Sequence, residues 1–387
     1  MQVDDLLIEV RAPDFSRIGQ FRPGDLVGAK FILKFNNVGS WEMRLPQGSR
    51  LGELLRLPGY GIIVTGPDDT VLFSGPTLSA QLLQTSNNID GDWTIQGSSD
   101  DIVLFERLAY PTPSTADVTE QTDAYDDRLG FCETIIKQYV SVNIGPDAPA
   151  ARKIANLTIQ PSEGLGLEVQ GRARFQPIQD VLYGLAQTSG LGYTIEQLGT
   201  DLQFTVYSPI DRTATVRMDM DNNKLSRAEY AYAIARVTRA IIGGQGEEEF
   251  RRFVEVTNAD SLESESDWSR RIEVFKDGRN SRVTEFLLQD GAEFLVDQGK
   301  TIVEMSVTPT DDFSMRFSRD WYLGDKVTVV INQLEASAIV TEVGISIQAD
   351  GVRIAATVGT PVGIEYESKV LAKTQQLAQR LSNLERQ

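Results

Sequence analysis

Residues 29–46 read AKFILKFNNVGSWEMRLP. Before the central Asn-Asn-Val-Gly, large apolar side chains occupy alternate positions at Phe31, Leu33 and Phe35. The alternation resumes after it at Trp41 and continues as far as Leu45. Two period-two runs around a turn that contains Asn and Gly are typical of a β-hairpin. We therefore expect this stretch to form a central hairpin of an antiparallel sheet.

More strands are expected around this hairpin, over positions 1–110. Turn-forming residues separate their apolar runs, which lie at residues 60–64, 71–75, 80–83 and 92–95. Together the runs predict a compact antiparallel sheet or barrel. The segment Tyr110–Thr115 holds two prolines and ends this unit.

The next part of the chain, residues 111–206, has a different pattern. Apolar spacing predicts one helix over residues 126–140 and a second over residues 178–188. Short strands are expected at 193–195 and 202–206, which makes this part a small α+β unit. The side chains expected to face inward are Leu129, Cys132, Ile136 and Val140 in the first helix, and Ile178, Val181, Leu182 and Leu185 in the second.

The alternating pattern returns at residue 228, and the chain then contains an internal repeat. Residues 29–46 align without gaps on residues 228–245, and residues 59–82 align on residues 324–347. In the second copy a charged segment of about residues 247–320, with one helix expected over 283–298, separates the two blocks. Insertions of this kind add little loop-closure entropy. The pattern favours two similar β-domains, each accompanied by an α+β excursion.

The C-terminal segment carries a heptad-like seam. Its members are Val370, Thr374, Leu377, Leu381 and Leu384. Steps of alternately four and three residues are those of a coiled coil. Two heptads are short for that structure, so two alternatives stay open: a trimeric coiled coil, or a lone amphipathic helix on its own domain.

Composition argues against a catalytic site. The 387 residues include no histidine, which removes the commonest general base and the usual ligand for zinc. The one cysteine, Cys132, lies in an apolar pattern and is expected to be a buried structural thiol. No cofactor, metal or catalytic residue is expected. Residues Asp219–Asn223 weakly resemble a calcium-binding loop but lack its required Gly and bidentate Glu. The paired carboxylates Asp126-Asp127 are explained by a helix start, and Asp311-Asp312 by a turn.

The net charge and the lengths of the apolar segments limit which partners and surroundings are expected for the chain. The net charge of −18 disfavours nucleic-acid binding through a basic groove, and it suggests an acidic wall past which DNA could slide. No apolar stretch reaches the roughly 20 residues that cross a bilayer. No signal peptide is visible at the start, so assembly in the host cytoplasm is expected.

Several stretches, taken in their order, resemble a known family. They are residues 21–25, 35–46, 71–75, 241–246 with 251–256, and 323–327 through 358–360. Over about residues 5–365 the chain is similar to minor tail proteins of long-tailed siphophages, notably those of actinobacteriophages, of the baseplate-hub or tail-associated type. No peptidase, muralytic or fibre domain is recognisable after residue 365.

The resemblance implies a β-rich α+β multidomain fold. That fold has two tail-tube-like antiparallel β-barrel domains, two smaller peripheral α+β domains and a C-terminal helix. The expected division is residues 1–110 for the first β-domain, 111–206 for a peripheral domain, 207–246 with 321–362 for the second β-domain, 247–320 for an inserted peripheral domain, and 363–387 for the helix.

The resemblance also implies a function. Such proteins are structural virion proteins at the tail tip that assemble as trimers and join the sixfold tail tube to threefold tip components. Tail tube, distal tail, tape measure and other tip or fibre proteins are the implied partners, and DNA passes through without specific binding. The alternatives are a peripheral module that binds host glycans, the hub of a contractile injection machine, and a carboxylate-dependent glycosidase.

Overall fold

The computed structural model describes residues 6–86, 88–222, 224–246, 250–278, 283–309, 315–331, 334–348 and 351–359. The fold is β-rich, as the sequence predicts. In the first part of the chain the elements are β1 (Leu7–Arg11), β2 (Arg17–Phe21), β3 (Gly28–Lys34), β4 (Ser40–Pro46), α1 (Arg50–Leu55), β5 (Gly61–Thr65), β6 (Val71–Thr85) and β7 (Asn88–Ser98). Six strands of the second part join them: β13 (Arg217–Asp219), β14 (Leu225–Ala233), β18 (Ile302–Pro309), β19 (Lys326–Ile331), β20 (Leu334–Gln348) and β21 (Gly351–Gly359).

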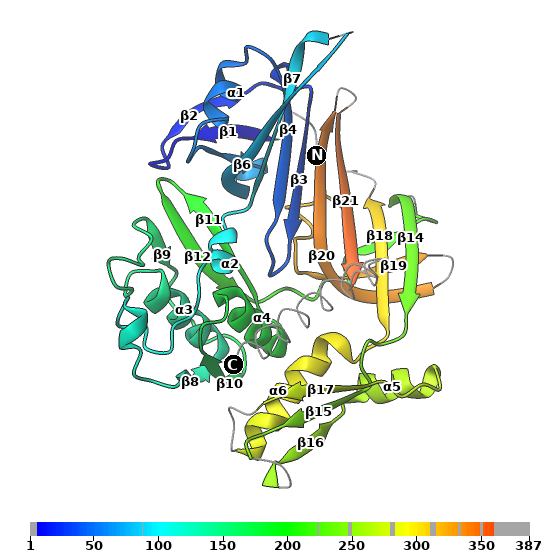
Figure 1. Cartoon of the computed structure of the whole chain (residues 1–387). Helices are drawn as coiled ribbons and strands as arrows, with labels where there is room; N and C mark the ends of the chain where they lie inside the picture. The colour runs from blue at the N-terminus through cyan, green and yellow to red at the C-terminus, as the bar shows by residue number, and fades with distance from the viewer. Residues whose placement is uncertain are drawn as a thin grey trace.

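Within the described ranges these strands form one large sheet (Figure 1). Its main path runs β14-β18-β21-β20-β3-β4-β7-β6-β5-β1-β2, and off this path β19 pairs with β20 and β13. The expected hairpin is confirmed, because β3 pairs antiparallel with β4 and Phe31 lies opposite Trp41.

Two sets of five strands share one pairing order. The first set is β3-β4-β7-β6-β5, and the second is β14-β18-β21-β20-β19. A β-bulge interrupts the two long strands at corresponding places, at Leu78 in β6 and at Thr341 in β20. Gly59 and Gly324 stand before β5 and β19 with φ angles of 82° and 89°, which glycine adopts readily. The internal repeat is therefore present in the strand topology.

Two details of the expected repeat were wrong. Residues 239–245 do not form the counterpart of β4, because β15 (Arg239–Gly243) pairs with other strands and β18 takes that place. The inserted segment thus begins directly after β14, before the expected residue 247. The bulges also place Ala80 of β6 on Val343 of β20, whereas the sequence alignment placed it on Ile345. How many domains the chain comprises stays a prediction.

The apolar core of the sheet is shared by both sets of strands. Phe31, Trp41 and Met43 from the first set belong to the same buried cluster as Val343 and Ile345 from the second. Burial of large apolar side chains is the main favourable term in folding. The shared core therefore holds the two sets together as well as stabilising each one.

The α+β unit packs around its own core. Its elements are α2 (Ile102–Glu106), β8 (Asp126–Phe131), α3 (Cys132–Asn143), β9 (Leu157–Ile159), β10 (Glu168–Ala173), α4 (Ile178–Ser189), β11 (Gly192–Leu198) and β12 (Asp201–Tyr207). The second expected helix is confirmed as α4, and all four of its inward side chains are buried. The first expected helix starts too early, because residues 126–131 form β8 on β10. Leu129 consequently lies on the surface.

The inserted segment forms a small three-stranded sheet with two helices. These elements are β15, β16 (Phe253–Val256), α5 (Ala259–Asp267), β17 (Glu273–Asp277) and α6 (Thr284–Gln298). The helix expected near residues 283–298 is confirmed as α6, whereas α5 was not anticipated. Gln289 of α6 donates a hydrogen bond to the Gln170 carbonyl of β10 at 3.2 Å, so the insert contacts the α+β unit.

Candidate assembly site

The junction between the two repeats is a strand pair inside the chain. β3 and β20 run antiparallel with Leu33 opposite Val343 and Phe31 opposite Ile345, and all four side chains are buried. The Phe35 N–H donates to the Thr341 carbonyl at 3.0 Å at the end of this pairing. On the other face of the sheet, Lys34 Nζ lies 3.9 Å from Glu342 Oε2. The repeats are thus joined by backbone hydrogen bonds with an apolar face beneath them.

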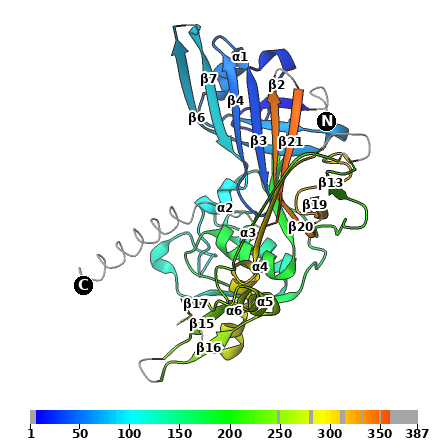
Figure 2. The same ribbon diagram turned by 90° about the vertical axis from the view of Figure 1, so that its right-hand side faces the viewer.

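Several strands of the sheet lack a second neighbour in the described structure. β2 pairs only with β1 and β13 only with β19, and two further borders of this kind lie at β14 and in the outer half of β6. β14 pairs only with β18, and residues 77–85 of β6 pair only with β7. Figure 2 shows β6 at the outer side of β7, and Figure 1 shows β14 at the opposite side of the sheet. Large side chains on these borders are exposed: Leu78 by 59%, Leu83 by 57% and Tyr232 by 61%. Unpaired, apolar strand borders are ready to pair with another chain.

The sheet face opposite the core carries charges of both signs. Its cations include Lys30, Lys34, Arg44 and Arg353, and its carboxylates include Glu42, Asp92 and Glu342. Arg44 Nη2 lies 3.5 Å from Asp92 Oδ2, so opposite charges are interspersed on this face. The described part of the face is therefore not the acidic surface that the net charge of −18 suggested.

A buried polar network ties the α+β unit to the first set of strands. The Arg11 guanidinium contacts both carboxylate oxygens of Asp100, at 2.5 and 2.7 Å, and donates to Gln197 Oε1 at 3.0 Å. Ser74 Oγ donates to Asp100 at 2.6 Å. These groups are almost fully buried. Buried charges persist when they are paired and hydrogen-bonded in this way.

Asn36, in the β3–β4 turn, forms a second connection to the same unit. Its φ of 51° is a left-handed conformation that Asn tolerates better than most residues. The Asn36 side chain donates to the Leu191 carbonyl at 2.8 Å and accepts from the Tyr193 N–H at 2.9 Å. The Gln179 side chain donates to the Asn36 carbonyl at 2.6 Å. The turn predicted from sequence therefore also anchors the α+β unit.

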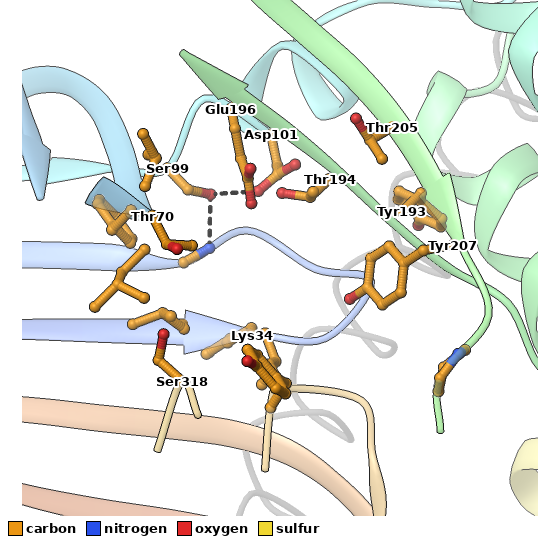
Figure 3. Close-up of a pocket in the computed structure, with 18 of the residues that line it drawn as sticks. Lys34, Thr70, Ser99, Asp101, Tyr193, Thr194, Glu196, Thr205, Tyr207 and Ser318 are labelled. Carbon is orange, nitrogen blue, oxygen red and sulfur yellow. Dashed lines mark hydrogen bonds between the residues drawn. The ribbon is translucent and has the colours of Figure 1, made fainter. Parts of the chain in front are cut away.

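A pocket of about 420 Å³ lies beside these connections, between β3, β11, β12 and the segment that precedes β19 (Figure 3). Asp101 and Glu196 both line it, and burial raises the pKa of each carboxyl to about 7. Asp101 accepts hydrogen bonds from the Ile195 N–H at 2.7 Å and from Ser99 Oγ at 2.9 Å. Because both of its oxygens are engaged by the protein, Asp101 braces the junction between the units.

The residues singled out in the sequence are scattered in the structure. Cys132 is buried, its Sγ donates to the Leu185 carbonyl at 3.2 Å, and burial raises its pKa to about 11, as suits a structural thiol. Asp126 begins β8 and pairs with Arg128 at 2.9 Å. The Asp219 carboxylate accepts from the Asp221 N–H at 2.9 Å. Two sets lie outside the described residues: the seam Val370, Thr374, Leu377, Leu381 and Leu384, and the pair Asp311-Asp312.

Sequence reasoning missed an aromatic cluster on the β14 border. The rings of Tyr230 and Tyr232 lie 5.8 Å apart, and the ring of Trp268 lies 5.9 Å from that of Tyr232. The two tyrosines were visible as an alternating pair. Trp268 comes from the end of α5, whose position next to β14 no local pattern reveals.

None of the helices in the described ranges combines the length and apolar character needed to cross a membrane. Among the described residues, no group of three or more potential ligands could hold a metal ion.

Known structures share this fold. The chain is similar to the 43 kDa tail protein of prophage MuSo2 from Shewanella oneidensis, with a TM-score of 0.56, 12% identity, and coverage of 92% of this chain and 98% of the other. It is also similar to a tail protein from Neisseria meningitidis MC58, with a TM-score of 0.54, 11% identity, and coverage of 92% and 96%. No curated protein sequence matches the chain. The model of the Siphovirus ReqiPepy6 Gp37-like protein family matches residues 7–360, and the chain therefore belongs to this family of siphovirus tail proteins.

Proposed function

We propose that the chain is a non-catalytic structural protein that forms a homotrimeric hub at the tip of the phage tail. The repeat of five strands in one pairing order, with the two copies joined side by side through β3 and β20, carries this proposal. A chain with two similar units presents two similar surfaces. Three chains then offer six such surfaces to a sixfold tube and keep a true threefold axis for the components below.

Closed symmetry makes this arrangement self-limiting. A cyclic assembly stops growing when its last interface closes, whereas an open arrangement of the same contacts produces filaments. Closing the sheet into a ring also removes the borders at β6 and β14. The tail tube, distal tail, tape measure and other tip or fibre proteins are the proposed neighbours.

The proposed ring surrounds a channel through which DNA leaves the virion. The sheet face opposite the core would form the channel wall, and the charges there are interspersed. Binding to a phosphate backbone grows with the number of cations that can contact it together. Pairing of Lys34 with Glu342 and of Arg44 with Asp92 reduces that number, which favours passage without specific binding.

The test is imaging of the tail tip in virions of the phage whose genome encodes this chain. The expected result is three copies at the tip, each contributing two lobes to a ring directly below the sixfold tube. Six copies in one ring, or a position along the shaft of the tail, would refute the hub. The mass of the full-length protein in solution adds a second measurement, with a trimer expected at three times 42.8 kDa.

One observation favours a second candidate function, a peripheral module that binds host glycans. Tyr232 and Trp268 are exposed and lie in one aromatic row with the half-buried Tyr230, and sugar rings commonly stack on such surfaces. Binding of the full-length protein to a glycan array, lost in Trp268→Ala, would support this alternative. Retention of trimers in Trp268→Ala without any glycan signal would favour the hub.

A further inference from the structure

The geometry points to a specific contact between copies of this chain: residues 79–84 of β6 pair antiparallel with residues 228–233 of β14 from the next copy. This inference rests on the proposed hub and adds the surface, the partner strand and the register. The junction between the repeats inside one chain serves as the template. If each repeat meets its neighbour in the same way, the contact between chains repeats the contact between β20 and β3.

The strand register fixes which residues correspond. The bulges superimpose β6 on β20 so that Ala80 corresponds to Val343 and Leu82 to Ile345. The register of β3 on β14 follows from the pairing of β7 and β21 through β4 and β18. In that register Phe31 corresponds to Tyr230 and Leu33 to Tyr232.

The internal junction now predicts the pairs of the external one. Val343 faces Leu33 and Ile345 faces Phe31 in β20 and β3. Substituting the corresponding residues places Ala80 opposite Tyr232, and Leu82 opposite Tyr230. On the other face, the predicted pairs are Ser79 with Ala233, Gln81 with Ala231, and Leu83 with Glu229.

Side-chain size and exposure agree with this register. Leu33 is 8% exposed beneath the internal junction, whereas its counterpart Tyr232 is 61% exposed in the single chain. The small Ala80 leaves room for the large Tyr232, and the apolar Leu82 lies opposite the ring of Tyr230, within the distance at which side chains directly across two strands interact. No predicted pair sets like charges against each other. The border residues therefore have the composition of an interface that a second chain covers.

Hydrogen-bonding geometry selects the positions for a test. In the internal junction the Phe35–Thr341 bond marks a hydrogen-bonded pair. Alternation then makes Ile32–Gly344 a non-hydrogen-bonded pair, with Cα atoms about 4.5 Å apart. The corresponding external pair is Ala231 with Gln81. A disulfide needs a Cα separation of about 4.4–6.8 Å, so cysteines at such a pair can be bridged.

The experiment compares four double-cysteine variants of the full-length protein under mild oxidation by diamide. Two are matched to the predicted register: Gln81→Cys with Ala231→Cys, and Ser79→Cys with Ala233→Cys. Two are crossed, Gln81→Cys with Ala233→Cys and Ser79→Cys with Ala231→Cys, and place the cysteines diagonally at about 7–8 Å. All four alter the same positions, so the register is what differs between the matched and crossed variants.

A variant of the internal junction provides the positive control. Ile32→Cys with Gly344→Cys places cysteines at the template pair, and a side chain at Gly344 meets its nearest atom, the Ala355 carbonyl oxygen, at 3.9 Å. It should form an intrachain disulfide whatever the assembly state. The native Cys132 is buried and is common to every variant.

The expected result is a covalent ladder that ends at three chains for the matched variants, with at least tenfold less product for the crossed ones. Trimers of the unmodified protein without matched cross-links, or with equally strong crossed ones, would overturn the β6–β14 contact and leave the hub standing. A ladder beyond three chains would overturn closure. Neither trimers nor cross-links, with the internal control oxidised, would overturn both the contact and the hub.

Discussion

The substitution Asp101→Asn should reduce the dependence of stability on pH. The Asp101 carboxyl is 9% exposed, and burial raises its pKa from an ordinary 3.8 to about 7. The unfolded chain keeps the ordinary value. Between these two values the folded protein holds a proton that the unfolded chain has released. The stabilising contribution is therefore complete below pH 3.8 and is lost as the pH rises to about 7.

The magnitude follows from the width of that interval. Each unit of pKa difference corresponds to about 1.36 kcal/mol. Between pH 5 and pH 8 the folded carboxyl must lose its proton across about two units, which amounts to about 3 kcal/mol. Asparagine does not ionise, and its carbonyl oxygen can still accept the hydrogen bond from the Ile195 N–H. The variant should therefore gain about 3 kcal/mol over the parent protein on going from pH 5 to pH 8.

Urea unfolding at pH 5 and pH 8 measures this difference directly. Glu196 also has a pKa raised to about 7 by burial. The charge of Asp101 is a second cause of that rise, so Asp101→Asn also lowers the Glu196 pKa, and this change adds to the expected gain in the same direction. Asp90→Asn, which alters an exposed carboxylate on β7, is the matched control and should follow the parent protein. If the free energies of unfolding of Asp101→Asn and of the parent protein change by the same amount between pH 5 and pH 8, burial does not hold the Asp101 carboxyl protonated.

Other substitutions test the packing and the corrected boundaries. Asp100→Asn leaves the buried Arg11 guanidinium without an ionised partner and should cost about 3–5 kcal/mol in urea unfolding. Ile345→Ala removes a fully buried side chain at the internal junction and should cost about 2–5 kcal/mol, read from the shift of the same transition. Leu129→Ser should change the free energy of unfolding by less than about 0.5 kcal/mol, because this residue lies on the surface of β8. A destabilisation as large as that of a core substitution would instead support the helix predicted over residues 126–140. Cys132, whose pKa burial raises to about 11, should react with a thiol reagent at pH 8 only after denaturant is added, as followed by absorbance.

Local periodicity carried most of the prediction of strands and helices. The β3–β4 hairpin, α4 and α6 each have a pattern that is complete within one short stretch of sequence, and all three were predicted. The helix predicted over residues 126–140 began too early because β8 runs directly into α3. Leu129 of β8 also fits the helical spacing of the apolar residues that starts at Cys132. Pairing with β10 along the whole of β8 decides that segment, and β10 begins only at Glu168, beyond the end of α3.

Pairing between distant strands was beyond the reach of periodicity. The sequence alignment placed residues 239–245 on β4 because any alternating run fits equally well, whereas β18, at Ile302–Pro309, has that place. The two-residue error in the alignment of β6 with β20 could not be detected from the sequence pattern either. A register shift by an even number of residues keeps every side chain on its own face of the sheet. The buried connections of Arg11 to Gln197 and of Asn36 to Leu191 join distant parts of the chain and likewise have no local signal.

The differences between the two repeats follow from the different surroundings that the proposed ring gives them. The internal junction is formed once, during folding, and can use purely apolar side chains such as Leu33 and Phe31. The external border must remain soluble until a second copy arrives. Tyrosine suits both situations, because its ring buries apolar area while its hydroxyl keeps contact with water. Tyr230 and Tyr232 stand where the first repeat has Phe31 and Leu33, which is the difference expected if the next copy covers the β14 border in the proposed ring.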